Sequence, residues 1–167
     1  EMGLSLNTEQ LSLGLRVSKW QTLKDIAAPI VPPYDRLPQF TARYAKNNLY
    51  GFDFSITGDV TRFSSDASLT KQPNVNRGIL HAQVSRPWIN PGWFFTPKLQ
   101  VHATRYAFDD AVSNGARSAN RVLPTFSLDS GLVFERDTQI FGRNVLQTFE
   151  PRAFYTYTPY RDQSYIP

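Results

Sequence analysis

Apolar residues recur at every second position over long stretches of this chain. In residues 121–137, Val122 and Phe126 share one parity, whereas Thr125 and Asp129 share the other. A period of two is typical of β-strands that have one apolar face and one polar face. This run is much longer than the ~5–6 residues that are usual for strands of soluble proteins. The sequence therefore predicts long, two-faced strands.

The same alternation continues through most of the chain. It is clearest in residues 50–63, where Phe52 and Phe54 alternate with Asp53 and Ser55. No credible helix is found. About eight strands are predicted, at residues 1–7, 11–23, 38–45, 50–63, 77–88, 93–108, 121–137 and 145–163.

The predicted connections alternate strictly between short and long. Turns near 7–10, 46–49, 89–92 and 138–144 are short, and loops at 24–37, 64–76 and 109–120 are long. An antiparallel up-and-down meander places all the short connections at one end, as transmembrane β-barrels do with strands of ~9–11 residues. The predicted fold class is all-β, a meander of about eight long strands within a large transmembrane β-barrel. Because the chain opens on an alternating stretch and stops straight after a turn-like one, residues 1–167 are expected to be one segment of that barrel domain, incomplete at both ends.

Aromatic residues near the strand ends support the same interpretation. Tyr44 and Tyr50 flank one short turn, and Trp88 and Trp93 flank another. Such rings resemble the aromatic girdles at the two interfaces of a membrane barrel. The alternative is a soluble β-sandwich or a lipocalin-like barrel, in which the apolar faces form the core. Periodicity alone leaves both open, although strand length and loop asymmetry favour the membrane.

The composition excludes several other classes. Charged residues make up 19% of the 167 residues, below the ~25% typical of soluble domains. The net charge of +4 is scattered along the chain, so no nucleic-acid partner is expected. Cysteine is absent from the chain, which rules out a disulfide or a thiolate metal site within it. No apolar window reaches the ~18 residues that a transmembrane helix requires.

Polar residues on the strands are the candidate site residues. If the apolar face meets lipid, the opposite face lines a wet lumen. Folding about the short turns is expected to bring Arg43 opposite Asp53 and Arg152 near Asp129, and each such pair contributes roughly 0.2–1 kcal/mol. The full set of predicted lumen-facing residues is Arg43, Asp53, His81, His102, Asp129, Glu150 and Arg152.

No catalytic constellation is found, and the chain is expected not to be an enzyme. His81 and His102 lie on polar faces of neighbouring strands, but a metal site would need further ligands. The SLDSG stretch at 127–131 lacks the strand–turn–helix context of a nucleophile elbow. No catalytic residue, cofactor or metal is therefore predicted.

Several stretches resemble one family. RVLPTFSLDSGLVFERD at 121–137, QTFEPRAFYTYTPYRDQS at 147–164 and GWFFTPKLQVHATRY at 92–106 are similar to the LptD family of outer-membrane lipopolysaccharide-assembly proteins. The resemblance runs from about residue 11 to the end of the chain. It implies a location in the outer membrane of a Gram-negative bacterium and a barrel of roughly 26 strands.

The resemblance also implies a transport role with named partners. In this family, lipopolysaccharide arrives from a periplasmic bridge through an N-terminal jelly-roll domain and leaves through a lateral opening into the outer leaflet. A lipoprotein, LptE, plugs the barrel. This chain resembles the middle of the barrel, so the implied role is wall and lumen lining in contact with outer-membrane lipid. Two alternatives stay open: a porin-like or ligand-carrying barrel, and an outer-membrane barrel enzyme.

Overall fold

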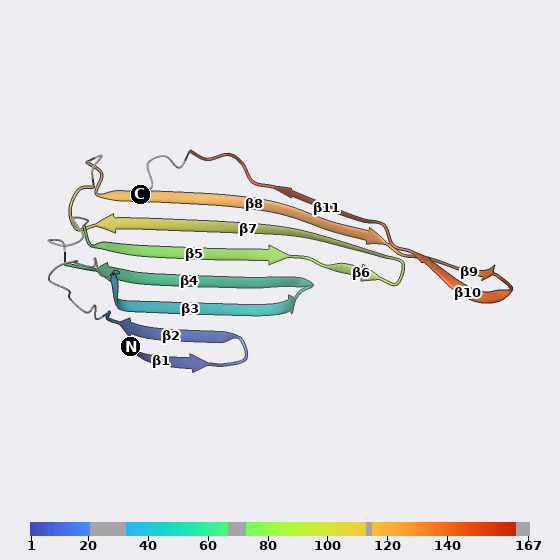
Figure 1. The fold of residues 1–167 in the computed structure, drawn as a ribbon, viewed down its shortest axis with the longest axis horizontal. Helices are drawn as coiled ribbons and strands as arrows, with labels where there is room; N and C mark the ends of the chain where they lie inside the picture. Colours follow the sequence, from blue (N-terminus) through green and yellow to red (C-terminus); the bar gives the residue numbers. More distant parts are fainter. Residues whose placement is uncertain (21–32, 67–72, 113–114, 163–167) are drawn as a thin grey trace, which may run out of the picture.

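The structure, a computed structural model, describes residues 1–20, 33–66, 73–112 and 115–162. Eight strands form one antiparallel meander in the order β1-β2-β3-β4-β5-β7-β8-β11 (Figure 1). Their bounds are β1 Met2–Asn7, β2 Leu11–Ser18, β3 Asp35–Leu49, β4 Phe52–Ser64, β5 Val75–Ser85, β7 Trp93–Phe108, β8 Ser118–Leu132 and β11 Arg152–Tyr157. The short strand β6 (Trp88–Asn90) pairs with β7, and β9 (Phe134–Ile140) pairs with β10 (Arg143–Phe149) in a separate hairpin. The predicted all-β antiparallel meander is confirmed.

Short and long connections alternate along this meander, as the sequence predicts. Two residues separate β3 from β4 and two separate β6 from β7, whereas the segments between β2 and β3, β4 and β5, and β7 and β8 are much longer. The turns that join β1 to β2, β3 to β4 and β6 to β7 lie at one end of the sheet (Figure 1). Within the described ranges, no helix is long and apolar enough to cross a membrane.

The strand registers join the separate apolar faces into one. Leu13 pairs with Ala42, Ala42 with Gly58 and Gly58 with Leu80. The row continues from Leu80 to Ala103 and from Ala103 to Val122. Residues directly opposite each other share a face of the sheet. The apolar side chains of six strands therefore form one continuous surface, and a second such row is Leu11, Tyr44, Ile56, Ala82, Val101 and Pro124.

This apolar face is uncovered. Leu4 is 76% exposed, Val60 60% and Val122 54%, although they lie on the face that a soluble sandwich would bury. Among the described residues, the one buried apolar side chain is Ala119, and the buried polar ones, Thr61, Thr104 and Ser127, lie on or beside the opposite face. No second layer packs on the sheet within the described part of the chain, so the soluble sandwich is not the observed architecture.

The turn between β3 and β4 differs from its predicted position. It was expected at residues 46–49, but it lies at Tyr50 and Gly51, whose φ angles are 53° and 84°. Two consecutive positive φ angles are the requirement of the tight hairpin turn that suits the twist of the strands. Asn48 also has a positive φ of 53°, and the register shifts between Lys46 and Leu49. The bulge thus adds one residue to β3 just before the turn.

The two long C-terminal runs are each broken in the middle, which the sequence did not predict. Val133 separates β8 from β9, and residues 150–151 separate β10 from β11. Pro151 cannot donate to a ladder, but its carbonyl accepts from the Leu132 N–H at 3.0 Å, while the Val133 N–H turns to the Gly92 carbonyl at 2.8 Å. The β9–β10 hairpin then continues past the ends of the neighbouring strands (Figure 1).

The boundaries at the long-loop end also differ from the predictions. β2 ends at Ser18 rather than at residue 23, and residues 21–23 lie outside the described ranges. β3 begins at Asp35, so Pro38 is inside it, where the register shifts between Arg36 and Gln39. The missing N–H of proline is accommodated by that irregularity.

Candidate functional site

The polar face of the sheet is the candidate functional surface. Rows of polar side chains cross it as the apolar rows cross the other face. Gln83 of β5 lies directly opposite Gln100 of β7, and the Gln100 Nε2 donates to the Gln83 Oε1 at 3.1 Å. On the next strand, Thr125 lies opposite Gln100. Such cross-strand pairs hold neighbouring polar side chains together on one face of the sheet.

The predicted Arg43–Asp53 pair is wrong. Arg43 lies opposite Thr57 on β4 and opposite Ser12 on β2. Asp53 instead pairs across β4 and β5 with Ser85, and its Oδ1 accepts from the Asn48 N–H at 2.8 Å. The turn lies at Tyr50–Gly51 rather than about Asn48, and this moves the partner of Arg43 from Asp53 to Thr57. Asp53 instead accepts from the backbone of the bulge before the turn.

The two histidines lie together. His81 of β5 is directly opposite His102 of β7, with ring centroids 6.2 Å apart and planes at 89°. The Thr104 Oγ1 lies 3.5 Å from the His102 Nε2. Within the described ranges, no group of three or more His, Asp or Glu side chains is placed to hold a metal ion.

The predicted Arg152–Asp129 pair is confirmed. Phe154 of β11 is the direct partner of Asp129 on β8, and Arg152 is two residues before it. Arg152 Nε donates to Asp129 Oδ1 at 2.8 Å, and its Nη2 donates to Oδ2. Two parallel N–H donors on one carboxylate fix the guanidinium in orientation as well as in place.

Glu150 is exposed and lies in no strand, in the break between β10 and β11. Its carboxylate is therefore not in the polar rows of the sheet, and it lies next to Pro151 at the foot of the projecting hairpin. The other six predicted residues all lie on strands, with the partners given above.

A polar cluster around Asp59 was missed by the sequence analysis. Gln39 Nε2 donates to Asp59 Oδ2 at 2.6 Å, and Thr61 Oγ1 donates to Asp59 Oδ1 at 2.7 Å. Arg77 Nη2 lies 3.5 Å from the same Oδ1, and its guanidinium carbon is 4.8 Å from the centroid of the Phe63 ring. Parity places Asp59 on the polar face, but its partners come from β3 and β5, so only the register identifies them.

Aromatic and basic groups meet where β7, β8 and β11 come together at the short-turn end. Phe94 lies opposite Gly131, and the Arg152 guanidinium carbon lies 5.7 Å from the Phe94 ring centroid. The Asp129 carboxylate holds that guanidinium from the other side. Three stretches distant in sequence thus build one cluster on the polar face, here called the Phe94 cluster.

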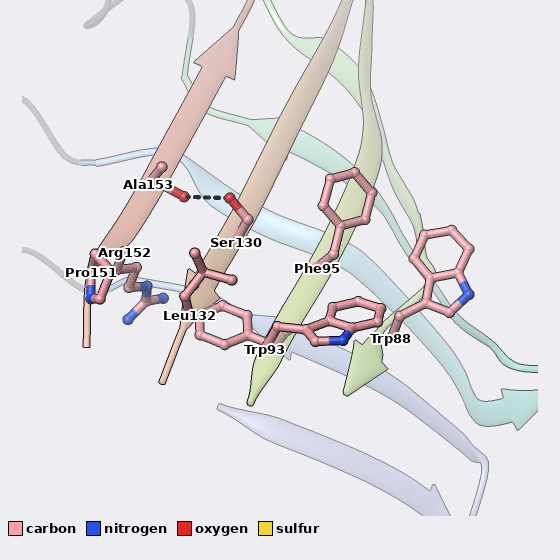
Figure 2. Close-up of a pocket in the computed structure, with 10 residues that line it drawn as sticks. Trp88, Trp93, Phe95, Ser130, Leu132, Pro151, Arg152 and Ala153 are labelled. Atoms are coloured by element: carbon pink, nitrogen blue, oxygen red, sulfur yellow. Dashed lines mark hydrogen bonds between the residues drawn. The ribbon is translucent and has the colours of Figure 1, made fainter. Parts of the chain in front are cut away.

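An apolar groove lies on the opposite face at the same end. Its volume is about 850 Å³. Phe95, Trp93 and Leu132 surround the small side chains of Ser130 and Ala153, which lie side by side on β8 and β11 (Figure 2). The Ser130 hydroxyl donates to the Ala153 carbonyl at 3.5 Å, so the one hydroxyl on the floor is directed back to the protein. The lining is therefore mostly hydrocarbon-like, with Arg152 as its one charged residue.

Comparison with known proteins identifies the family of this chain. The LptD family, described as LPS transport system D, matches residues 1–167, the whole chain. Relatives named LPS-assembly protein LptD include one from Polaromonas, 57% identical over 170 residues and 98% of this chain. Another, from Paracidovorax citrulli, is 62% identical over 94% of this chain, and one from Cupriavidus necator is 41% identical over all of it.

The chain spans about a fifth of the length of these relatives, 21% of the Polaromonas and Cupriavidus proteins and 19% of the Paracidovorax protein. The matches therefore concern one segment of each relative. Because the family profile covers every residue and the identities are far above those of chance similarity, this chain belongs to the LptD family of LPS transport proteins.

Proposed function

We propose that this chain forms part of the wall and lumen lining of an outer-membrane β-barrel that inserts lipopolysaccharide into the outer leaflet of a Gram-negative bacterium. The proposal rests chiefly on the family match over the whole chain. It draws on relatives whose name is LPS-assembly protein. In this proposal, residues 1–167 are one segment of the barrel domain.

The exposed apolar face supports a membrane location. Ile56, Leu80 and Leu99, at the middle of their strands, are 48%, 46% and 47% exposed. Leaving such a surface in water costs free energy in proportion to its area, whereas hydrocarbon is its natural neighbour. Strands that lie in lipid also need partners for every backbone group. β1 and β11 are the outer strands of the meander within this chain, so we infer that strands from the rest of the protein continue the sheet.

The lengths of the connections suggest the orientation. Outer-membrane barrels have short turns on the periplasmic side and longer loops outside the cell. The Tyr50–Gly51 turn and the projecting β9–β10 hairpin would then lie on the periplasmic side. The long segments that follow β2, β4 and β7 would lie at the cell surface.

The polar face would line the lumen. The side chains that we assign to it are Arg43, Asp53, His81, His102, Asp129 and Arg152, with Glu150 at the periplasmic edge. The partners proposed for the whole protein are lipopolysaccharide, an LptE-like plug lipoprotein and a periplasmic lipopolysaccharide bridge. The last of these would act through parts of the protein beyond this segment.

The family match favours transport over the two alternatives. A porin-like barrel shares the two-faced strands but not the sequence motifs that match across the whole chain. A barrel enzyme needs a nucleophile beside an oriented base. His81 faces His102, and His102 lies beside Thr104; within the described ranges neither ring is paired with a carboxylate.

Depletion of the full-length protein in its own bacterium tests the proposal. Newly made lipopolysaccharide should stop reaching the cell surface, as measured by access of an external modifying enzyme to it, while the outer membrane keeps its porins. Restoring the full-length gene should restore surface lipopolysaccharide. Unchanged surface lipopolysaccharide together with altered uptake of small solutes would favour the porin-like barrel and refute transport.

A further inference from the structure

One guanidinium lies at the short-turn end of the apolar face. Arg86 lies between β5 and β6, with its guanidinium carbon 4.9 Å from the ring centroid of Phe52 and 4.9 Å from that of Trp88. Its backbone N–H donates to the Pro97 carbonyl at 3.2 Å, which holds the residue against β7. Two aromatic rings from different strands thus hold one cation in a fixed place.

The charge of Arg86 is not neutralised by its neighbours. Among the described residues, no carboxylate lies within 4.0 Å of its guanidinium and no acceptor takes a hydrogen bond from it. Stacking on rings orients a guanidinium but leaves its five N–H donors free. The geometry of those donors matches a phosphate or carboxylate in a two-point contact. Arg86 is therefore prepared for an anion supplied from outside the chain.

The Arg86 site adjoins the apolar groove. The ring of Trp88, on which Arg86 stacks, lies 5.7 Å from the ring of Phe95, and both rings line the groove. Figure 2 shows Trp88, Phe95 and Trp93 grouped on the side of it away from Ala153. An anion-binding group and a hydrocarbon-lined groove that share one tryptophan match the two halves of a membrane lipid, the phosphate and the acyl chain.

We propose that Arg86, Phe52 and Trp88 bind the phosphate of a glycerophospholipid, and that an acyl chain of this lipid occupies the groove beside Phe95 and Leu132. The site deepens the proposed function, because it requires that the apolar face lies in a bilayer. Short turns lie on the periplasmic side of such barrels. The leaflet on that side of an asymmetric outer membrane consists of glycerophospholipid, which is why this lipid rather than lipopolysaccharide is the occupant.

The full-length protein, purified in detergent, tests the site by native mass spectrometry with added phosphatidylglycerol. Arg86→Gln should weaken the apparent affinity about tenfold, the loss expected for charge-assisted hydrogen bonds. Arg86→Lys, which keeps the charge but not the two-point geometry, should lose less. The matched control is Arg105→Gln, which removes a guanidinium opposite Gly78 near the other end of β7 and should change nothing.

Binding of two further lipids tests the specificity of the site. Diacylglycerol, which has the acyl chains without the phosphate, should bind about as weakly to the original protein as phosphatidylglycerol binds to the Arg86→Gln variant. Purified lipopolysaccharide should not displace phosphatidylglycerol. Equal retention of phosphatidylglycerol by the original protein and by Arg86→Gln would overturn the proposal, as would displacement by lipopolysaccharide.

A failure of the lipid site can be distinguished from a failure of the proposed transport function. The Arg86→Gln variant should still fractionate with the outer membrane and should still support surface lipopolysaccharide, because the site lies on the opposite face from the proposed lumen. If the original protein does not reach the outer membrane, the proposed function is contradicted. A correctly located protein whose lipid binding ignores Arg86 would contradict only the lipid site.

Discussion

The ring of Phe94 lies in the space that a side chain at Gly131 would occupy. The two residues are direct partners on β7 and β8, and an added Cβ at Gly131 would clash with three carbons of that ring. Arg152 then lies over the other part of the ring, with its guanidinium carbon 5.7 Å from the centroid. The absence of a side chain at one position thus allows an aromatic ring and a cation to be placed beside Asp129.

Gly131→Ala should destabilise the protein by about 1–3 kcal/mol, the usual cost of forcing extra atoms into an occupied space. In a Phe94→Ala background, the same change should cost much less, because the space is then empty. Denaturant unfolding of the full-length protein in detergent gives both values. An equal cost in the two backgrounds would show that Phe94 does not fill the space above Gly131.

Engineered disulfides test the β3–β4 register. Arg43→Cys with Thr57→Cys should cross-link on mild oxidation, because directly opposite residues have Cα separations of ~4.5–5.5 Å, within the range for a disulfide. Arg43→Cys with Asp53→Cys should not cross-link, since those residues are four positions out of register. The measurement is the mobility shift on non-reducing gels, in full-length protein from which any cysteine outside residues 1–167 has been replaced. The reverse result would show that the β3–β4 turn lies at residues 46–49 and not at Tyr50–Gly51.

A charge on the apolar face should prevent membrane assembly. Ile56→Lys introduces an ammonium near the middle of β4 on the exposed apolar face, at a cost of about 2–4 kcal/mol if that site is near the bilayer midplane. Thr57→Lys, one residue along on the polar face, is the matched control and should assemble. The amount of folded protein in the outer membrane, measured by heat-modifiable gel mobility, compares them. If both variants assemble equally well, the apolar face does not contact lipid.

The projecting hairpin should be dispensable for assembly of the sheet. β9 and β10 pair only with each other among the described strands, and Phe141 at their turn is fully exposed. Replacing residues 134–149 by Asn-Gly should therefore leave the β8–β11 pairing and the outer-membrane level unchanged. Removing residues 43–58, the same length about the Tyr50–Gly51 turn, should abolish assembly because it deletes paired strand. A comparable loss in the two deletions would indicate that the hairpin packs on another part of the protein.

Local alternation was sufficient to predict most of the strands and the face on which each side chain lies. Val122 and Phe126 are on the apolar face, and Asp129 is on the polar face, as their parity predicts. The Arg152–Asp129 pair was also predictable, because the turn at Phe141–Gly142 lies within the predicted turn at 138–144 and its register places both side chains on the polar face. The Arg43–Asp53 pair was not, because the turn lies at Tyr50–Gly51, whose positive φ angles parity does not encode, rather than about Asn48.

The sequence by itself determined the two-faced strands. Apolar residues recur at every second position, and an extended backbone places alternate side chains on opposite faces. Partnerships such as Asp59 with Gln39 and Arg77, or Arg86 with Phe52 and Trp88, were decided only by the folded sheet. They join residues from different strands, and the register between strands depends on positive-φ turns and bulges that parity does not encode. The exposure of the apolar face was likewise settled only in three dimensions, because the same alternating strands could have packed into a second sheet.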